Sequence, residues 1–336
     1  MRNEHYEALR LVEEWLIENG APGPIHFWNP PMEAGPTLDR FAKEQAVEAS
    51  TYWAPTHVAL QAYIRSTASA QGTLVILASR QKAETLGAVA SLLQPGHQLL
   101  ILAASNDWGS HSYQKHLKSV WPQLESLSGR KCRLSIIRQP ETTHPNLATW
   151  RVDAQPFLLS QEPEWWTQAG VFGWKKHDGG SLLLEETLAT ADLHGTVVDA
   201  GAGTGYLSHA VLTHHQPTAV SLVEADLRAV ECARKNLAAI STVPCEFIWH
   251  DFLTWHPSQP VQHVIMNPPF HQGRRADREY GQRFLLHAHE ILAPGGSLWV
   301  VANAFLPYEA LLRNSYASLE PVVRTESYKV LLAQKS

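Results

Sequence analysis

A glycine-rich stretch that follows an apolar run places the strongest constraint on how this chain can fold. The run 196–200 carries Asp199 and leads directly into Gly201, Gly203 and Gly205, after which a helical pattern begins. Glycines allow the backbone to approach a bound ligand closely, and a helix that starts at such a loop presents free N–H groups. The stretch therefore predicts a strand, a ligand-binding loop and a helix within a parallel α/β sheet.

Two further apolar runs each end at an acidic residue. The run 219–223 precedes Glu224, and the run 245–250 precedes Asp251. A carboxylate after the second strand of such a fold can bind both hydroxyls of a ribose. In enzymes that use S-adenosylmethionine, the glycine loop surrounds the methionine and ribose, and an acid after the third strand faces the adenine. Because we find no contacts for a nicotinamide, the three acids, Asp199 included, favour S-adenosylmethionine over a dinucleotide.

The run 264–266 stops at Asn267-Pro268-Pro269-Phe270. Proline lacks the N–H that a strand ladder needs, so the strand must end there. The Asn267 side chain and the Pro268 carbonyl are acceptors suited to an exocyclic amine, and Phe270 offers a ring face on which a flat base can stack. The alternative is that Asn-Pro-Pro only ends a strand.

Strands alternate with helices along the chain, which predicts an α/β fold with parallel sheets. The chain length fits two domains, and we place the catalytic one at 166–336. Its expected elements besides those above are a helix from Leu182 capped by Ser181, helices over 227–237, 284–292 and 309–316, and strands over 297–302 and 327–333. Together they predict a seven-stranded sheet with an antiparallel edge.

Residues 1–165 are predicted to form the other α/β domain. Helices are expected over 7–18, 38–49, 81–93 and 110–124, strands over 73–78, 97–103 and 132–138, and a loop over 21–36. No glycine follows the strand 73–78, so we expect no cofactor in this domain. A second Asn-Pro-Pro, at 29–31, lies in the predicted loop and is interpreted as non-functional. The domain is a candidate for a related fold that has lost its site.

Composition narrows the class of protein. Apolar residues make up 44% and charged residues 18% of the chain, without a long uncharged apolar run, so we expect a cytoplasmic protein without a membrane span. The three cysteines lack the paired spacing of a metal site. The net charge of −5 does not indicate a nucleic-acid partner, but Arg274, Arg275 and Arg278 gather beside the Asn-Pro-Pro-Phe edge. They are either phosphate contacts or part of a solvated helix face.

Several stretches of the second half together resemble a known family. They are 197–205, 267–271, 301–308, 328–330 and, in the junction before the second domain, 170–172 and 178–181, whereas 174–177 departs from the family's pattern. These stretches are similar to the ribosomal RNA small subunit methyltransferase C family. The resemblance is specific over 166–336 and looser over the first domain, where that family carries a degenerate copy of the methyltransferase fold. It implies methylation of the exocyclic N2 of a guanine in 16S ribosomal RNA, within a small-subunit particle.

The resemblance and the patterns above give a set of expected site residues. The cofactor-binding residues are Asp199, Gly201, Gly203, Gly205, Glu224, Asp251 and Asn267. The catalytic residues are Asn267, Pro268, Pro269 and Phe270. The substrate-binding residues are Phe172, Asp178, His271, Arg274, Arg275 and Arg278. Because a duplexed guanine hides its amine against its partner, the target base must be unpaired or flipped out.

Alternatives stay open at this point. The same Asn-Pro-Pro-aromatic edge serves enzymes that methylate a large-subunit guanine, the N6 of DNA adenine or a protein glutamine. DNA is disfavoured because no separate basic recognition domain is present, and glutamine because its enzymes usually carry tyrosine where Phe270 stands. The chain could also be a non-catalytic RNA-binding assembly protein, although the intact acids and glycine loop argue against this. A monomer is favoured.

Overall fold

The computed structural model describes residues 4–64, 70–269 and 275–336, with the side chains of 275–278 left out. The chain divides into two compact units, Met1–Pro156 and Phe157–Ser336. The sequence placed the domain boundary at 165, and the stretch after Pro156 forms a two-stranded antiparallel hairpin of β7 (Phe157–Gln161) and β8 (Glu164–Thr167). Among the described residues, no helix is long and apolar enough to cross a membrane.

The second unit is built on a seven-stranded sheet with the strand order β11-β10-β9-β12-β13-β15-β14. Its strands are β9 (Thr196–Ala200), β10 (Ala219–Glu224), β11 (Cys245–Trp249), β12 (Val261–Met266), β13 (Leu292–Asn303), β14 (Ser318–Arg324) and β15 (Tyr328–Gln334). The first five strands in the order are parallel, and β15 pairs antiparallel with both β13 and β14. This confirms the predicted seven-stranded sheet with an antiparallel edge.

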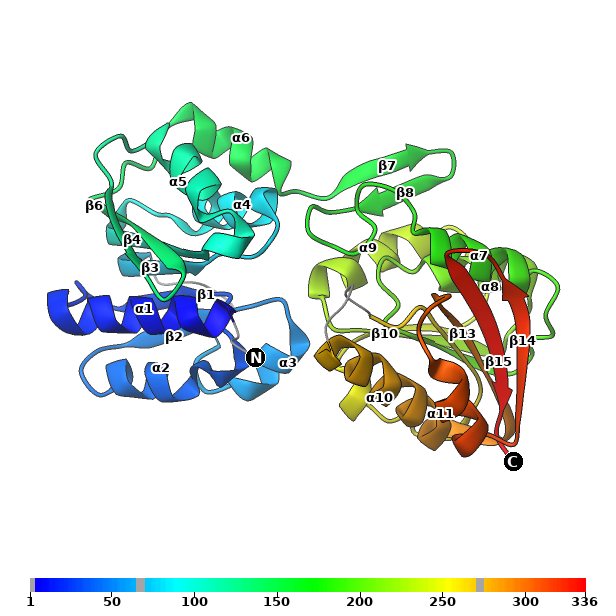
Figure 1. The fold of residues 1–336 in the computed structure, drawn as a ribbon. Coiled ribbons are helices and arrows are strands. Elements are labelled where there is room, and N and C mark those ends of the chain that lie inside the picture. Colours follow the sequence, from blue (N-terminus) through cyan, green and yellow to red (C-terminus); the bar gives the residue numbers. More distant parts are fainter. Residues whose placement is uncertain (1–3, 65–69, 270–274) are drawn as a thin grey trace. The chain divides into compact units, whose positions relative to one another are not determined.

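Helices cover both faces of the second sheet (Figure 1). They are α7 (Gly179–Leu188), α8 (Tyr206–His214), α9 (Leu227–Leu237), α10 (Arg275–Ile291) and α11 (Tyr308–Ser315), with a short 3-10 helix at Phe252–Thr254. Alternate residues of β12 pack into different layers: Val264 and Met266 lie in the cluster with α10 and α11, and Ile265 lies in the cluster with α7, α8 and α9. A strand buried on both faces reads as a continuous apolar run, as residues 264–266 of β12 do.

The first unit is a smaller sheet with the strand order β2-β1-β3-β4-β6-β5. Its elements are α1 (Glu4–Asn19), β1 (Ile25–Trp28), a 3-10 helix (Met32–Ala34), α2 (Gly35–Ala42), β2 (Val47–Ser50), α3 (Ala54–Ala59), β3 (Gln71–Leu77), α4 (Lys82–Leu92), β4 (Gly96–Ser105), a 3-10 helix (Asn106–Trp108), α5 (Ser110–Lys118), β5 (Glu125–Gly129), β6 (Cys132–Arg138) and α6 (Pro145–Asp153). Here too β6 pairs antiparallel with both of its neighbours. The order repeats that of the second sheet without a counterpart of β11, which confirms tandem domains of one fold.

The first sheet corrects two sequence predictions. The predicted loop 21–36 contains β1, the strand that corresponds to β9, and the predicted helix 38–49 is divided between α2 and β2. All four residues of β1 are buried, so the strand shows no alternation that could reveal it between its flanking prolines. In the second unit, α7 begins at Gly179 rather than at Leu182.

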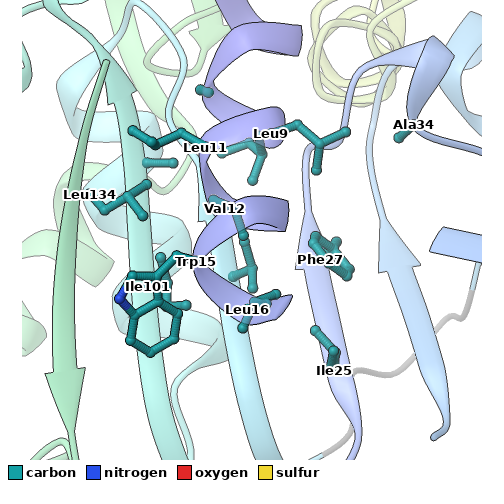
Figure 2. Packing of buried hydrophobic residues seen from close by; sticks show 14 of the residues in the cluster. Leu9, Leu11, Val12, Trp15, Leu16, Ile25, Phe27, Ala34, Ile101 and Leu134 are labelled. Atoms are coloured by element: carbon teal, nitrogen blue, oxygen red, sulfur yellow. The ribbon is translucent and has the colours of Figure 1, made fainter. Parts of the chain in front are cut away.

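The core of the first unit lies on both faces of its sheet. Figure 2 shows Leu9, Val12 and Leu16 on α1, with Ile25 and Phe27 on β1 beside the helix, and all five belong to one cluster. The helix itself packs mainly against β4 and β6. The opposite face carries Leu74 and Ile76 of β3 against α4, α5 and α6. The first unit therefore has apolar cores of its own on both faces of its sheet.

Candidate functional site

The predicted polar residues of the second unit gather at one edge of its sheet. Strand pairing aligns the last residue of β9, Ala200, with Val223 of β10 and with Met266 of β12. Glu224 is likewise aligned with Trp249 near the end of β11. Because these strands are parallel, the loops that follow them emerge at the same edge. The structure therefore brings together the glycine loop and the loops that carry Asp251 and Asn267.

All three glycines of the loop adopt left-handed backbone conformations, with φ of 70° at Gly201, 55° at Gly203 and 85° at Gly205. A Cβ added at Gly205 would lie 3.2 Å from the Cβ of Ala233, whereas one added at Gly203 would meet nothing within 4 Å. Gly205 is thus required by packing of the loop against α9. Gly203 faces open space, as a backbone that approaches a ligand must.

Glu224 connects the loop to the second strand. Its Oε2 accepts from the backbone N–H of Gly203 at 2.8 Å, and its Oε1 accepts from the N–H of Asp226 at 2.8 Å. Burial raises the pKa of Glu224 to about 7, although these two hydrogen bonds act to lower it. The carboxylate is therefore poorly solvated and would gain from hydroxyl donors.

Asp199 is buried inside the edge, with 1% of its surface exposed. Its Oδ2 accepts from the backbone N–H of Ser208 at 3.0 Å and from the Ser208 hydroxyl at 2.7 Å. Its Oδ1 has no hydrogen-bond partner within the described part of the chain. Burial raises the pKa of Asp199 to about 6. Asp199 thus stabilises the start of α8 through Oδ2, while its Oδ1 is an acceptor without a donor among the described residues.

Asp251 and Tyr280 complete the cofactor side of the edge. Asp251 caps the 3-10 helix that follows it, through Oδ1 and the N–H of Leu253 at 3.0 Å. Burial raises the pKa of Tyr280 to about 12, and the nearby carboxylates of Asp251 and Glu224 add to the shift. Tyr280 on α10 therefore lies within electrostatic range of both acids. The sequence analysis missed this residue because nothing in the local pattern of α10 indicates which of its residues faces the acids.

These residues fit S-adenosylmethionine, the cofactor expected from the sequence. The loop leaves open space at Gly203, and two poorly solvated carboxylates with acceptor capacity flank it. Carboxylates suit both the hydroxyls of a ribose and the positive charge of an amine or sulfonium. No group of three or more potential metal ligands occurs among the residues described.

Asn267 is held by two acceptors from the start of α7. Its Nδ2 donates to Oδ2 of Asp178 at 2.8 Å and to Oγ of Ser181 at 3.0 Å. Asp178 also caps α7, because the same Oδ2 accepts from the N–H of Gly180 at 2.9 Å and of Ser181 at 3.0 Å. The predicted cap at Ser181 is therefore wrong. Asp178 is the cap because the helix begins three residues before Leu182.

Of the remaining predicted site residues, the structure describes some, and the others lie outside the described part of the chain. Strand β12 ends at Met266 as predicted, with Pro268 buried and Pro269 exposed after it. Phe172 is 62% exposed on the loop that leads to Asp178. The residues Phe270, His271 and Arg274 lie outside the described part of the chain, as do the side chains of Arg275 and Arg278, whose backbone begins α10.

The chain is similar to known proteins both in sequence and in fold. The methyltransferase small domain family matches residues 162–332. The ribosomal RNA small subunit methyltransferase C of Pseudomonas aeruginosa (strain LESB58) is 29% identical over 259 residues, which cover 77% of each chain. The protein of the same name from Salmonella newport (strain SL254) is 31% identical over 242 residues, covering 72% of this chain and 68% of that one.

A solved structure matches nearly the whole chain. The 16S rRNA N2 G1207 methyltransferase (RsmC) of T. thermophilus, in complex with AdoMet and guanosine, superimposes with a TM-score of 0.77 at 24% sequence identity. The match covers 97% of this chain and 92% of that one, so both chains contain two tandem domains of this fold.

Proposed function

The chain belongs to the ribosomal RNA small subunit methyltransferase C family, and we propose that it transfers a methyl group from S-adenosylmethionine to the exocyclic N2 amine of a guanine in 16S ribosomal RNA. Membership confirms the resemblance read from the sequence and makes the chain an S-adenosylmethionine-dependent methyltransferase. The observation that carries the proposal is the pairing of β9 with β12, which aligns Ala200 with Met266 and sets Asn267 beside the glycine loop.

The proposed cofactor contacts follow from the chemistry of the edge. The backbone of Gly201, Gly203 and Gly205 would border the methionine and ribose, and the Glu224 carboxylate would accept from the ribose hydroxyls. Asp251 would approach the adenine. The Oδ1 of Asp199, which is buried and has no partner in the described part of the chain, would accept from a donor on the methionine part. When bound, S-adenosylmethionine supplies a methyl group already activated by a positive sulfur.

The protein's main contribution is then alignment of the amine. Asn267 Oδ1 and the Pro268 carbonyl would accept its two hydrogens, which favours a pyramidal nitrogen whose lone pair points at the methyl group. The lone pair of the guanine amine is otherwise spread into the ring. No strong base is needed before transfer, since the proton can leave afterwards, and His271 is the proposed acceptor. Pro269 would keep the segment extended, and Phe270 would lie against the base.

Presentation of the base would use residues around the edge. An unpaired guanine loses its stacking neighbours, and the exposed ring of Phe172 is a proposed replacement. Arg274, Arg275 and Arg278 are proposed phosphate contacts. We assign Asp178 to the substrate side because it touches Asn267.

The proposed partner is a small-subunit particle, reached by a cytoplasmic monomer. We propose that the N-terminal domain, which the sequence places at residues 1–165, binds no cofactor. It would support the second unit and widen the RNA surface. A chain of residues 157–336 that stays folded and keeps full activity would disprove that role.

The function is tested by transfer of tritiated methyl groups from S-adenosylmethionine to small-subunit particles, large-subunit particles and protein-free RNA. The labelled nucleoside is then identified by mass. Label on guanine N2 in the small-subunit RNA is the expected result and also identifies the substrate form. Label on adenine, on protein or on the large subunit would show that the proposed substrate is wrong, whereas the conclusions on fold and cofactor would stand.

A further inference from the structure

Asn267 can serve a substrate amine only in one of its two amide orientations. With Oδ1 towards the amine, it accepts a hydrogen; with Nδ2 in that place, a donor faces a donor. The Asn267 side chain itself has no strong preference, because a half-turn about its Cβ–Cγ bond exchanges Oδ1 and Nδ2. Something outside Asn267 must therefore select the productive orientation.

In the structure, both hydrogens of Asn267 Nδ2 are directed at acceptors on α7. Asp178 Oδ2 lies 2.8 Å and Ser181 Oγ 3.0 Å from this nitrogen. In the reversed orientation, Oδ1 would face the carboxylate oxygen of Asp178, which carries no hydrogen to donate when ionised. The negative charge thus makes one orientation a charge-assisted hydrogen bond and the other a repulsive contact.

We propose that Asp178, supported by Ser181, is a positioning residue for methyl transfer: it holds the Asn267 amide with Oδ1 turned towards the substrate amine. This inference rests on the proposed function of Asn267. Asp178 would act through Asn267 rather than by direct contact with the guanine. Ser181 would help in the same way, because its hydroxyl accepts the second hydrogen of Asn267 Nδ2.

Asp178 itself is fixed by the fold around it. Two backbone N–H groups of α7 hold the same Oδ2 that meets Asn267, so the oxygen cannot move without loss of the helix cap. The ring of Tyr328 packs against the helix start, since a Cβ added at Gly180 would lie 3.1 Å from that ring and 3.0 Å from Asp178 Oδ2. The acceptor is therefore held rigidly, as orientation of a catalytic amide requires.

The test separates the cap from the orientation. Asp178→Ser keeps a good helix N-cap but is too short to reach Asn267, whereas Asp178→Asn keeps both the reach and an acceptor oxygen. Single-turnover transfer to guanine N2 is expected to slow about 10- to 100-fold in Asp178→Ser and to recover most of that loss in Asp178→Asn. The dissociation constant for S-adenosylmethionine is expected to stay within about twofold of wild type. Asp192→Ser, at a carboxylate that is 89% exposed, is the matched control.

The decisive measurement repeats Asp178→Ser in an Asn267→Ala background. If Asp178 acts only through Asn267, the second substitution causes no further loss of rate. Losses that multiply in the double variant, or a cofactor affinity that falls as much as the rate, would overturn the proposal and make Asp178 a direct ligand.

A readout that does not depend on activity keeps this inference separate from the proposed function. The side-chain amide signal of Asn267, assigned by its absence in Asn267→Ala, is expected to exchange with solvent at least about tenfold faster in Asp178→Ser than in wild type. Unchanged exchange would overturn the proposed orientation even if the enzyme methylates guanine. If exchange is faster in Asp178→Ser but the enzyme methylates another base, the proposed orientation of Asn267 stands and the proposed substrate is wrong.

Discussion

The middle glycine of the loop, Gly203, donates its backbone N–H to Oε2 of Glu224 at 2.8 Å. This contact joins two parts of the proposed cofactor site, because the carboxylate that shapes the loop is also the proposed acceptor for the ribose. Burial raises the pKa of Glu224 to about 7, so its charge depends on pH within the working range of an enzyme.

The first prediction concerns the pH dependence of cofactor binding. The raised pKa means that cofactor-free Glu224 is mostly protonated at pH 6 and mostly ionised at pH 8, and ribose hydroxyls donate best to the ionised form. Affinity for S-adenosylmethionine should therefore rise about tenfold from pH 6 to pH 8 and then level off. Calorimetric titrations at three pH values measure this. Glu224→Gln should bind more weakly with a flatter profile, whereas an equal slope in both proteins would assign the titration to the cofactor amine.

The second prediction contrasts two glycines of the loop. Alanine at either one strains a left-handed backbone, at a cost of about 1–2 kcal/mol in the free energy of unfolding. Gly205→Ala should destabilise more, because its Cβ would press on Ala233. Gly203→Ala has open space, so it should instead weaken cofactor binding, by about tenfold or more if the backbone contacts the ligand.

Urea unfolding and calorimetry on the same samples check this contrast. Gly295→Ala is the matched control, since Gly295 has φ of 75° and nothing within 4 Å of an added Cβ, but lies away from the loop. It should show the backbone strain without any change in cofactor affinity. Equal affinities for Gly203→Ala and Gly295→Ala would remove Gly203 from the proposed site.

The second sheet could be predicted from the sequence because residues with a clear physical effect mark where its central strands end. Glycines end β9 and prolines end β12, and each acid stands where a parallel strand finishes. The first sheet was harder. In β1, four buried residues lie between Pro24 and Asn29-Pro30, and turn-forming neighbours outweigh so short an apolar run.

Contacts between distant residues explain what could not be predicted within the site. Ser181 has the properties of a local helix cap in the sequence, yet its hydroxyl accepts from Asn267, 86 positions away. Tyr280 comes within electrostatic range of Asp251 and Glu224 through the packing of α10 against the 3-10 helix that Asp251 caps. Spacing along the chain predicts neighbours on one element, whereas these relationships depend on how the elements pack.

The third prediction is that Asn267→Ala leaves only a small residual rate of methyl transfer, still measurable in single turnover, and leaves cofactor affinity nearly unchanged. The side chain is proposed to act on the amine, and its described contacts are with Asp178 and Ser181 rather than with the glycine loop. Loss of the acceptor should lower the rate by about 10²- to 10³-fold or more. Filter-binding transfer assays and calorimetry measure the two quantities. An equal loss of cofactor binding would mean that Asn267 is misassigned.

The fourth prediction concerns a buried ion pair that holds the segment after β13. Lys329, 3% exposed, donates through Nζ to Oε1 and Oε2 of Glu309 at 2.7 and 2.8 Å, and also to the carbonyl of Leu306. Although burial acts to raise the pKa of Glu309, its bonds to Lys329 hold it below its ordinary value. A depressed carboxylate pKa stabilises the fold above the ordinary pKa, and this contribution is lost as pH falls through the depressed value.

Lys329→Met should therefore lower the free energy of unfolding by about 2–3 kcal/mol, less than for a fully buried pair because Glu309 is 25% exposed. Urea unfolding at neutral pH measures the loss. Lys329→Met with Glu309→Gln should recover part of it, because it removes a carboxylate whose remaining partner is the exposed Arg324, 3.8 Å away. Glu125→Gln breaks an exposed pair with Arg138, in which both side chains are more than half exposed, and should cost less than about 1 kcal/mol. If Lys329→Met lowered the free energy of unfolding no more than this control does, the buried pair would contribute no more to stability than an exposed one.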